Sequence, residues 1–345
     1  MAKGVLPPRF DPGSPEAQRD PYAVYAQLRE HDAICRIGPG TYGVTRHEDV
    51  RRLLRDPALG SEFPMQYHEM SSGVGAASSF FSRIVLYRDP PVHTRLRRLL
   101  GAAFTPASVR QLRPSIEALV GDLMEEPLAT GRFDAVSAVC YPLPVLVVCE
   151  LMGIPPEHRA EVRRYAADLG KAFAALVPQD DRAAANAAVD WLRDFVAGVI
   201  QDRQGSLETT GTPDVLTRLM TAEIDGERLS EHEIVDNAVF AFFAGFETTM
   251  NLLSAAFAYL GNNQEAQAEL RADSALLPSA IEELLRIEPP IQGAARLLHA
   301  DVSVGRHTLR AGRVAVLLIG SANRDPAVFD APDELRLDRT PNPHV

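Results

Sequence analysis

The sequence predicts a mainly α-helical protein with a small β region. From Pro90 to about Met220, apolar residues recur at intervals of three and four, the period of helices with one buried face. Ser230 and Glu233 form a capping box at the start of a further apolar stretch of roughly thirty residues, long enough to cross a domain. After Pro289 and Pro290 the period changes towards two, which is typical of strands.

The first elements follow in chain order. The stretch "YAVYAQLREH" predicts a helix, and "AICRIG" and "TYGVT" predict two short strands joined by the turn "GPG". The stretch "HEDVRRLLRDP" predicts a short helix that Pro57 ends. Residues 58–83 lack periodicity and are rich in Ser, Gly, Phe and Met, so we expect a long loop, either functional or a surface excursion.

The later elements include the longest predicted helix. The stretch "LSEHEIVDNAVFAFFAGFETTMNLLSAAFAYL" is apolar on nearly all sides, so we expect a central buried helix; the loop "RQGSLETTGTPD" is expected within the helical segment before it. A shorter helix is expected over about 279–288, and "VSVGRHTLRAGRVAVLLIG" predicts two strands. Because no long linker or internal repeat divides the chain, we expect one domain over residues 1–345.

Composition restricts the classes of function. The chain has 345 residues, 46% hydrophobic, and a formal charge of -11, which argues against a broad nucleic-acid surface. We find no signal peptide and no run of ~18 apolar residues, so we expect a soluble cytoplasmic protein without a membrane span. Cys35, Cys140 and Cys149 show neither metal-type nor disulfide-type spacing, so no metal site is predicted from them and a reducing compartment fits.

The motif "AGFETT" interrupts the apolar helix with an acid and two hydroxyls. A carboxylate such as Glu247 is costly there unless it is hydrogen-bonded or has a function. The Thr248 hydroxyl can bond back to the carbonyl four residues earlier. Ala244 and Gly245 leave a shallow groove in which a flat ligand can lie. The alternative, a packing groove beside a satisfied buried acid, has equal weight.

Two further motifs place charged residues on one helix face. The stretch "RDPPVHTRLRRLL" sets His93 and Arg97 four apart, where they can hold an anion, although a solvated basic face is the simpler interpretation. The stretch "EELLR" sets Glu283 and Arg286 three apart, which is usually an ordinary surface pair.

Taken together and in this order, the motifs resemble a soluble bacterial cytochrome P-450. The matching stretches are "HTRLRRLL", "AGFETT", "EELLR" and "ANRDPAVFDAPDELRLDR", and the resemblance runs from "DPYAVYAQLRE" to "PNPH". It implies the cytochrome P-450 fold, a haem b cofactor and the activity of a haem-thiolate monooxygenase. Such an oxidoreductase inserts one oxygen atom from O2 into an apolar small molecule, here in bacterial secondary metabolism such as antibiotic biosynthesis.

The resemblance also implies roles for matching residues. Glu247 and Thr248 match the acid–alcohol catalytic pair that delivers protons to the bound dioxygen. The residues implied to bind the cofactor fall into two groups. The haem propionates would be held by His93, Arg97 and Arg296, and the oxygen groove would be lined by Ala244 and Gly245.

Other residues match structural and pocket positions of the family. Glu283, Arg286 and Arg339 match a buried network that ties the β region to the helices, and breaking it would leave an unpaired charge. Residues 58–83 and 169–179 would shape the substrate pocket.

The resemblance implies partners as well. Electrons would come from NAD(P)H through a ferredoxin reductase and a ferredoxin. Arg95 and Arg98 are candidates for docking an acidic ferredoxin, with simple solvation as the alternative.

The last residues, "PNPHV", end where the family continues with a Phe-Gly-rich loop that carries the iron-binding cysteine. We therefore expect an incomplete cytochrome P-450 domain that lacks the Cys loop, the following helix and the last strands, and is inactive as written. The thiolate favours O–O cleavage, and all three cysteines present are expected to be buried structural thiols.

Three interpretations of this chain remain open. It is the front part of a working monooxygenase, which we favour, or a haem-less relative that activates a partner glycosyltransferase, or a non-functional remnant. Relatives of the second kind usually depart from the acid–alcohol and propionate motifs, which this sequence keeps.

Overall fold

The computed structural model describes residues 6–173, 177–204 and 214–345. By its internal contacts the chain divides into two compact units: unit 1, residues 1–61 with 252–345, and unit 2, residues 62–251. Each unit has a hydrophobic core of its own. The expectation of a single domain stays a prediction.

Unit 1 is built on a mixed sheet, which in the described residues has five strands in the order β1-β2-β9-β6-β3. Only the β2–β9 pair is parallel among them. The left-handed backbone of Gly40 (φ 72°) closes the predicted "GPG" turn. The strands are β1 (Ile34–Gly38), β2 (Thr41–Val44), β9 (Val314–Leu317), β6 (Ala294–Leu298) and β3 (Leu59–Gly60).

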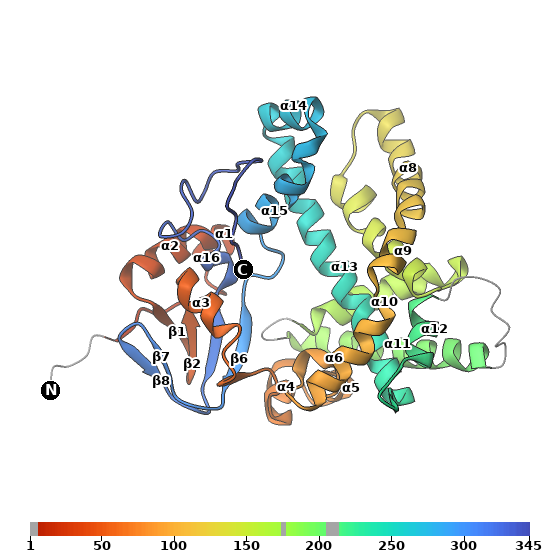
Figure 1. Ribbon diagram of the computed structural model, residues 1–345, viewed down its shortest axis with the longest axis horizontal. Coiled ribbons are helices and arrows are strands. Elements are labelled where there is room, and N and C mark those ends of the chain that lie inside the picture. The colour runs from red at the N-terminus through yellow and green to blue at the C-terminus, as the bar shows by residue number, and fades with distance from the viewer. Residues whose placement is uncertain (1–5, 174–176, 205–213) are drawn as a thin grey trace. The chain divides into compact units, whose positions relative to one another are not determined.

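Short helices and a separate hairpin complete unit 1 (Figure 1). Two strands were predicted over the stretch 302–320, and the structure has three there, because the chain turns at Gly305 and again at Gly312. The hairpin strands are β7 (Val302–Val304) and β8 (His307–Leu309). The helices are α1 (Pro15–Arg19), α2 (Pro21–His31), α3 (His47–Leu53), α14 (Gln264–Ala272), α15 (Leu277–Ile287) and α16 (Ile319–Ala322).

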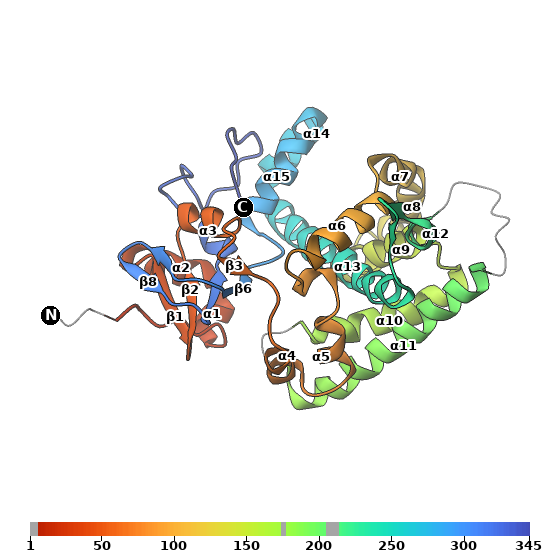
Figure 2. The same ribbon diagram turned by 60° about the horizontal axis from the view of Figure 1, so that its bottom comes forward.

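Unit 2 is almost entirely helical, as the sequence predicts. Figures 1 and 2 show α10 and α11 packed along each other, and α13 passing through the unit. A small hairpin, β4 (Glu223–Ile224) with β5 (Glu227–Arg228), precedes α13. The helices are α4 (Met65–Ser72), α5 (Ala76–Phe81), α6 (Val92–Ala103), α7 (Pro106–Gln111), α8 (Arg113–Thr130), α9 (Pro142–Leu151), α10 (Arg159–Lys171), α11 (Gln179–Gln204), α12 (Val215–Thr221) and the larger part of α13 (Glu231–Gly261), whose residues from 252 onward belong to unit 1.

Helix α13 begins at the predicted capping box. The Ser230 amide donates to the Glu233 carboxylate over 2.9 Å, and the Glu233 amide donates to the Ser230 hydroxyl over 3.3 Å. The helix is buried only as far as Phe246, and Phe257 near its end is 38% exposed. The expectation of a fully buried helix is therefore wrong for its second half. By length and composition an 18-residue window of α13 is apolar enough to cross a membrane, a measure that core helices of soluble proteins also satisfy.

The expected long loop at 58–83 is wrong, because α4 and α5 form there. Pro64 precedes α4, and Gly73, in a left-handed conformation (φ 82°), ends it. Phe80 and Phe81 of α5 are buried, so packing within unit 2 stabilises a helix too short to show a sequence period. Of the loop predicted over "RQGSLETTGTPD", residues 205–213 lie outside the described residues, as do 174–176 of the predicted pocket segment.

Candidate active site

The "AGFETT" motif lies in the middle of α13. Residues four apart on a helix share a face, so Ala244 and Thr248 lie one above the other. The Thr248 hydroxyl donates to the carbonyl of Ala244 over 2.7 Å, which confirms the predicted back-bond. Both side chains are only half-buried, so this face of α13 keeps a hydroxyl beside a small residue.

Glu247 lies on a neighbouring face of α13, together with Phe243 one turn earlier. Its Oε2 atom is buried, and no donor in the described part of the chain reaches it. Burial raises the pKa of the Glu247 carboxyl, so this acid keeps its proton more readily than an exposed glutamate does. This oxygen is thus not satisfied by the described residues, whereas the choice between a working acid and a structural one stays a prediction.

Gly245 lies on a third face of α13, against α9. A Cβ atom at this position would come within 2.7 Å of Cγ2 of Val148. For this glycine the structure shows the packing alternative, because the missing side chain lets the two helices approach. A role for the Gly245 backbone in an oxygen groove stays a prediction.

His93 and Arg97 lie one turn apart near the start of α6. The His93 amide donates to the carbonyl of Asp89 over 2.9 Å, which extends the helical hydrogen bonding back beyond Val92. Within the described ranges, neither side chain makes a hydrogen bond or an ion pair. His93 is half-buried and Arg97 is exposed, so two donors on one face remain free for an anionic ligand.

The other arginines of α6 are already paired. Arg95 forms an ion pair with Glu233 of α13. Arg98 donates to Asp225 and Glu227 of the β4–β5 hairpin, over 2.9 Å in each case. Their charges are thus balanced within unit 2, which weakens the expectation that they dock an acidic partner.

Unit 1 contains the remaining predicted residues. Arg296 lies on β6 opposite Ala315 of β9, and its guanidinium donates to the carbonyl of Ala295 over 2.9 Å. The network of Glu283, Arg286 and Arg339 is confirmed. Glu283 is fully buried, receives bonds of 2.7 and 2.8 Å from Arg286, and accepts from Arg339 over 2.9 Å. The surface-pair interpretation of "EELLR" is therefore wrong.

A second charged node was not predicted from the sequence. Asp236 of α13 is 1% exposed and forms ion pairs of 2.6 Å with Arg83 and of 2.8 Å with Arg193. The contact with Arg193 is an ion pair without the angles of a hydrogen bond. The neighbouring Asn237 accepts from the amide of Val85 over 2.9 Å. The partners are separated by more than forty positions along the chain, so no local pattern could have indicated them.

The three cysteines are fully buried, which agrees with their interpretation as structural thiols. Burial raises the pKa of Cys35 and of Cys149 to about 12, so neither is a thiolate at neutral pH. Within the described residues, no group of three or more His, Cys, Asp or Glu side chains is arranged to hold a metal ion.

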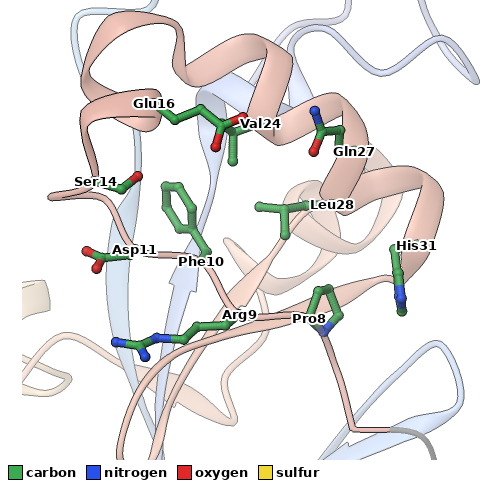
Figure 3. Close-up of a pocket in the computed structure, with 10 residues that line it drawn as sticks. All are labelled: Pro8, Arg9, Phe10, Asp11, Ser14, Glu16, Val24, Gln27, Leu28 and His31. Carbon is green, nitrogen blue, oxygen red and sulfur yellow. The ribbon is translucent and has the colours of Figure 1, made fainter.

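A surface hollow of about 460 Å³ lies on unit 1 between the N-terminal segment and α2 (Figure 3). Two of its polar side chains bond to the local backbone: Ser14 accepts from the Ala17 amide and Asp11 from the Gly13 amide.

Comparison with known proteins gives the family. A family model described as Cytochrome P450 matches residues 160–340. The chain belongs to the cytochrome P450 family. This P450 is 31% identical to "Polyketide biosynthesis cytochrome P450 PksS" of Bacillus subtilis (strain 168), over 97% of the chain and 84% of that protein. It is also 31% identical to "Cytochrome P450 monooxygenase PikC" of Streptomyces venezuelae, over 98% of the chain and 80% of that protein.

Solved structures give the same fold. The crystal structure of P450BioI in complex with a hexadec-9Z-enoic acid-ligated acyl carrier protein matches with a TM-score of 0.87 and 28% identity, over 95% of this chain and 84% of that one. The predicted fold class, mainly helical with a small β region of the cytochrome P450 type, is confirmed.

Proposed function

We propose that this P450 is a haem-dependent monooxygenase that inserts one oxygen atom from O2 into an apolar small molecule of bacterial secondary metabolism, in the cytoplasm. The observation that carries the proposal is the pair on α13. The Oε2 atom of Glu247 is buried and has no donor within the described residues, and the next residue, Thr248, donates its hydroxyl proton to the Ala244 carbonyl. A buried acid without a partner is costly to keep, which supports a functional role.

The residues of α6 and α13 fit a haem in their chemistry. His93 and Arg97 would hold the propionates, because both are free donors one helical turn apart. Arg296 of unit 1 is the third residue proposed for this role, and the small side chain of Ala244 would leave room beside the porphyrin. When bound, the haem supplies the activation of dioxygen.

Glu247 and Thr248 would deliver protons. Because burial raises the pKa of Glu247, its carboxyl would take up and keep a proton more readily than a fully exposed glutamate. The Thr248 hydroxyl donates to Ala244, so its oxygen lone pairs remain free to accept a hydrogen bond. In this role Glu247 would hold the proton to be delivered, and the Thr248 hydroxyl would orient the dioxygen molecule that receives it.

The substrate and the electron donor follow from chemistry and from the relatives. PksS is named for polyketide biosynthesis, and P450BioI was crystallised with an acyl-loaded carrier protein. Phe173 stacks on Phe243 at 3.6 Å between ring centroids and meets Phe81 edge-on at 4.7 Å, so the surroundings of Glu247 favour an apolar ligand such as an acyl or polyketide chain. We propose a ferredoxin with its reductase as the electron source.

Haemin binding tests the proposal. In an absorbance titration of the purified protein, we expect Arg97→Ala to weaken haemin binding about tenfold or more, since a charge-assisted bond contributes about 1.5–3 kcal/mol. The matched control is Arg98→Ala on the same helix, whose side chain is already paired with Asp225 and Glu227. Equal haemin affinity in the wild type and the Arg97→Ala variant would count against the haem site.

The alternative is a haem-less auxiliary protein that activates a glycosyltransferase. The sequence keeps the propionate and acid–alcohol motifs from which such auxiliary relatives usually depart, and the unpartnered Oε2 of Glu247 among the described residues adds to the case for the monooxygenase. Stimulation of a glycosyltransferase by protein that takes up no haemin would favour the auxiliary role instead.

A further inference from the structure

Two arginines of unit 2 share one buried carboxylate. Arg83, in the turn after α5, lies 2.6 Å from Oδ2 of Asp236, and Arg193 of α11 lies 2.8 Å from Oδ1 of the same side chain. Asp236 is 1% exposed, so this carboxylate of α13 lies beneath the two guanidiniums. The group has two positive charges and one negative charge, and its net charge is therefore +1.

The excess positive charge is not balanced by neighbouring acids. Within the described ranges, no carboxylate other than that of Asp236 lies within ion-pair distance of Arg83 or Arg193. On α13, Glu233 is already paired with Arg95. The charge of the two guanidiniums thus remains available to an anion from solution.

The terminal nitrogens of both arginines are free donors. A guanidinium has five N–H groups, one on Nε and four on its two Nη atoms. Arg83 uses Nε to donate to Asp236, and Arg193 faces the same carboxylate with its own Nε. In the part of the chain that the structure describes, their Nη atoms have no hydrogen-bond partner. The two side chains are 40% and 29% exposed, so a ligand in solution can reach them.

The arrangement is fixed before a ligand binds. Two guanidiniums repel each other, and the shared carboxylate holds them together in spite of this. The turn that carries Arg83 is also held, because Arg88 donates to the Ser82 carbonyl over 2.9 Å and Asn237 of α13 accepts from the Val85 amide over 2.9 Å. Groups that are already in place lose little freedom on binding, which favours affinity.

We propose that Arg83 and Arg193 form a binding site for a phosphate-type oxyanion, with Asp236 as the residue that positions both guanidiniums. Planar guanidiniums match the oxygens of such a group with two N–H bonds each. The bound anion would balance the excess charge and connect α11 and α13 with the turn after α5. The site uses none of the residues assigned to haem or to proton delivery, so it does not depend on the proposed function. The oxyanion is either free phosphate or the phosphoryl group of a larger ligand.

Equilibrium dialysis of the purified protein against radiolabelled inorganic phosphate tests the proposal, with the ionic strength held constant by sodium chloride. We expect saturable binding by the wild type and affinity lower by about tenfold or more in Arg83→Gln and in Arg193→Gln, because each change removes charge-assisted donors. The matched control is Arg98→Gln, a 44% exposed arginine of the same unit that is already paired with Asp225 and Glu227. This control should bind phosphate as the wild type does.

Folding of each variant is checked by circular dichroism, and a second variant covers the case in which a glutamine variant does not fold. Arg83→Lys keeps the positive charge but loses the planar fork, and it should also weaken phosphate binding. Competition with phenyl phosphate distinguishes the two sources of the oxyanion. Tighter binding of the monoester indicates the phosphoryl group of a larger ligand, and equal or weaker binding indicates free phosphate.

Three results would overturn the proposal. The first is the absence of saturable phosphate binding by the wild type up to about 10 mM. The second is equal affinity in the wild type, Arg83→Gln and Arg193→Gln. The third is loss of binding in Arg97→Ala but not in Arg193→Gln, since that result would place the anion at α6 instead.

Discussion

Replacing Glu283 is expected to unfold unit 1. The carboxylate is fully buried between two guanidiniums, those of Arg286 and Arg339. It also accepts from the amide of Arg336 over 3.0 Å and from Asn342 over 3.3 Å. Removing one partner of a buried ion pair costs about 3–5 kcal/mol, and here two cations lose their counter-charge at once. That is comparable to the whole stability of a domain, about 5–15 kcal/mol.

The assay is urea unfolding followed by two probes. Far-UV circular dichroism reports both units, and the fluorescence of Trp191, the single tryptophan of the chain, reports α11 in unit 2. The control is Glu282→Ala, next along α15, where the glutamate is 58% exposed and pairs with His344, so a change within about 0.5 kcal/mol is expected. A Glu283→Ala protein with wild-type stability in the circular dichroism transition would refute the reasoning.

The pH dependence of this loss has a defined sign. Burial alone would raise the pKa of Glu283, but the hydrogen bonds from Arg286, from the Arg336 amide and from Arg339 outweigh it and hold the pKa below its ordinary value. The stabilisation is therefore complete above the ordinary glutamate pKa of about 4.3 and is lost as the pH falls through the lower folded value. The wild type and the Glu283→Ala variant should converge in acid.

Three further predictions concern unit 2. In haem-loaded protein extended by the cysteine loop of the family and supplied with ferredoxin, reductase and NADPH, Thr248→Ala should release more hydrogen peroxide per NADPH, whereas exposed Thr249→Ala should not; equal ratios would argue against the proton-delivery role. Because burial raises the pKa of Glu247, the Glu247→Gln variant should match the wild type in stability near about pH 4 and become the more stable protein as the pH rises through the folded pKa. Equal stability of the two proteins over this pH range would contradict the assignment. Asp236→Ala should cost about 3 kcal/mol in the Trp191 fluorescence transition, and a change below about 0.5 kcal/mol would show the node to be dispensable.

The elements that sequence reasoning found have local signals. The capping box of Ser230 and Glu233 and the turn at Gly40 lie within a few residues of the elements that they begin or join. By contrast, α4 and α5 carry no periodic pattern of their own and depend on the burial of Phe80 and Phe81 against distant parts of unit 2. Short helices of this kind cannot be predicted without the tertiary packing.

The site shows the same division. The back-bond of Thr248 to Ala244 connects residues four apart and could be predicted from spacing alone. Whether Gly245 faces a ligand or a helix could not, since Val148 lies almost one hundred positions away. The pairing of Arg98 with the β4–β5 hairpin was equally hidden, so the sequence could not separate the paired cations of α6 from the free ones.

The central claim is that Arg97, with His93, is kept free on α6 to hold the acidic groups of a haem. The most direct measurement compares the dissociation constants of haemin and of its dimethyl ester, in which both propionates are neutral, for the wild type, Arg97→Ala and Arg98→Ala. The account predicts that the wild type and Arg98→Ala bind haemin at least about tenfold more tightly than the ester, and that this ratio falls markedly in Arg97→Ala. The same ratio in all three proteins would contradict it.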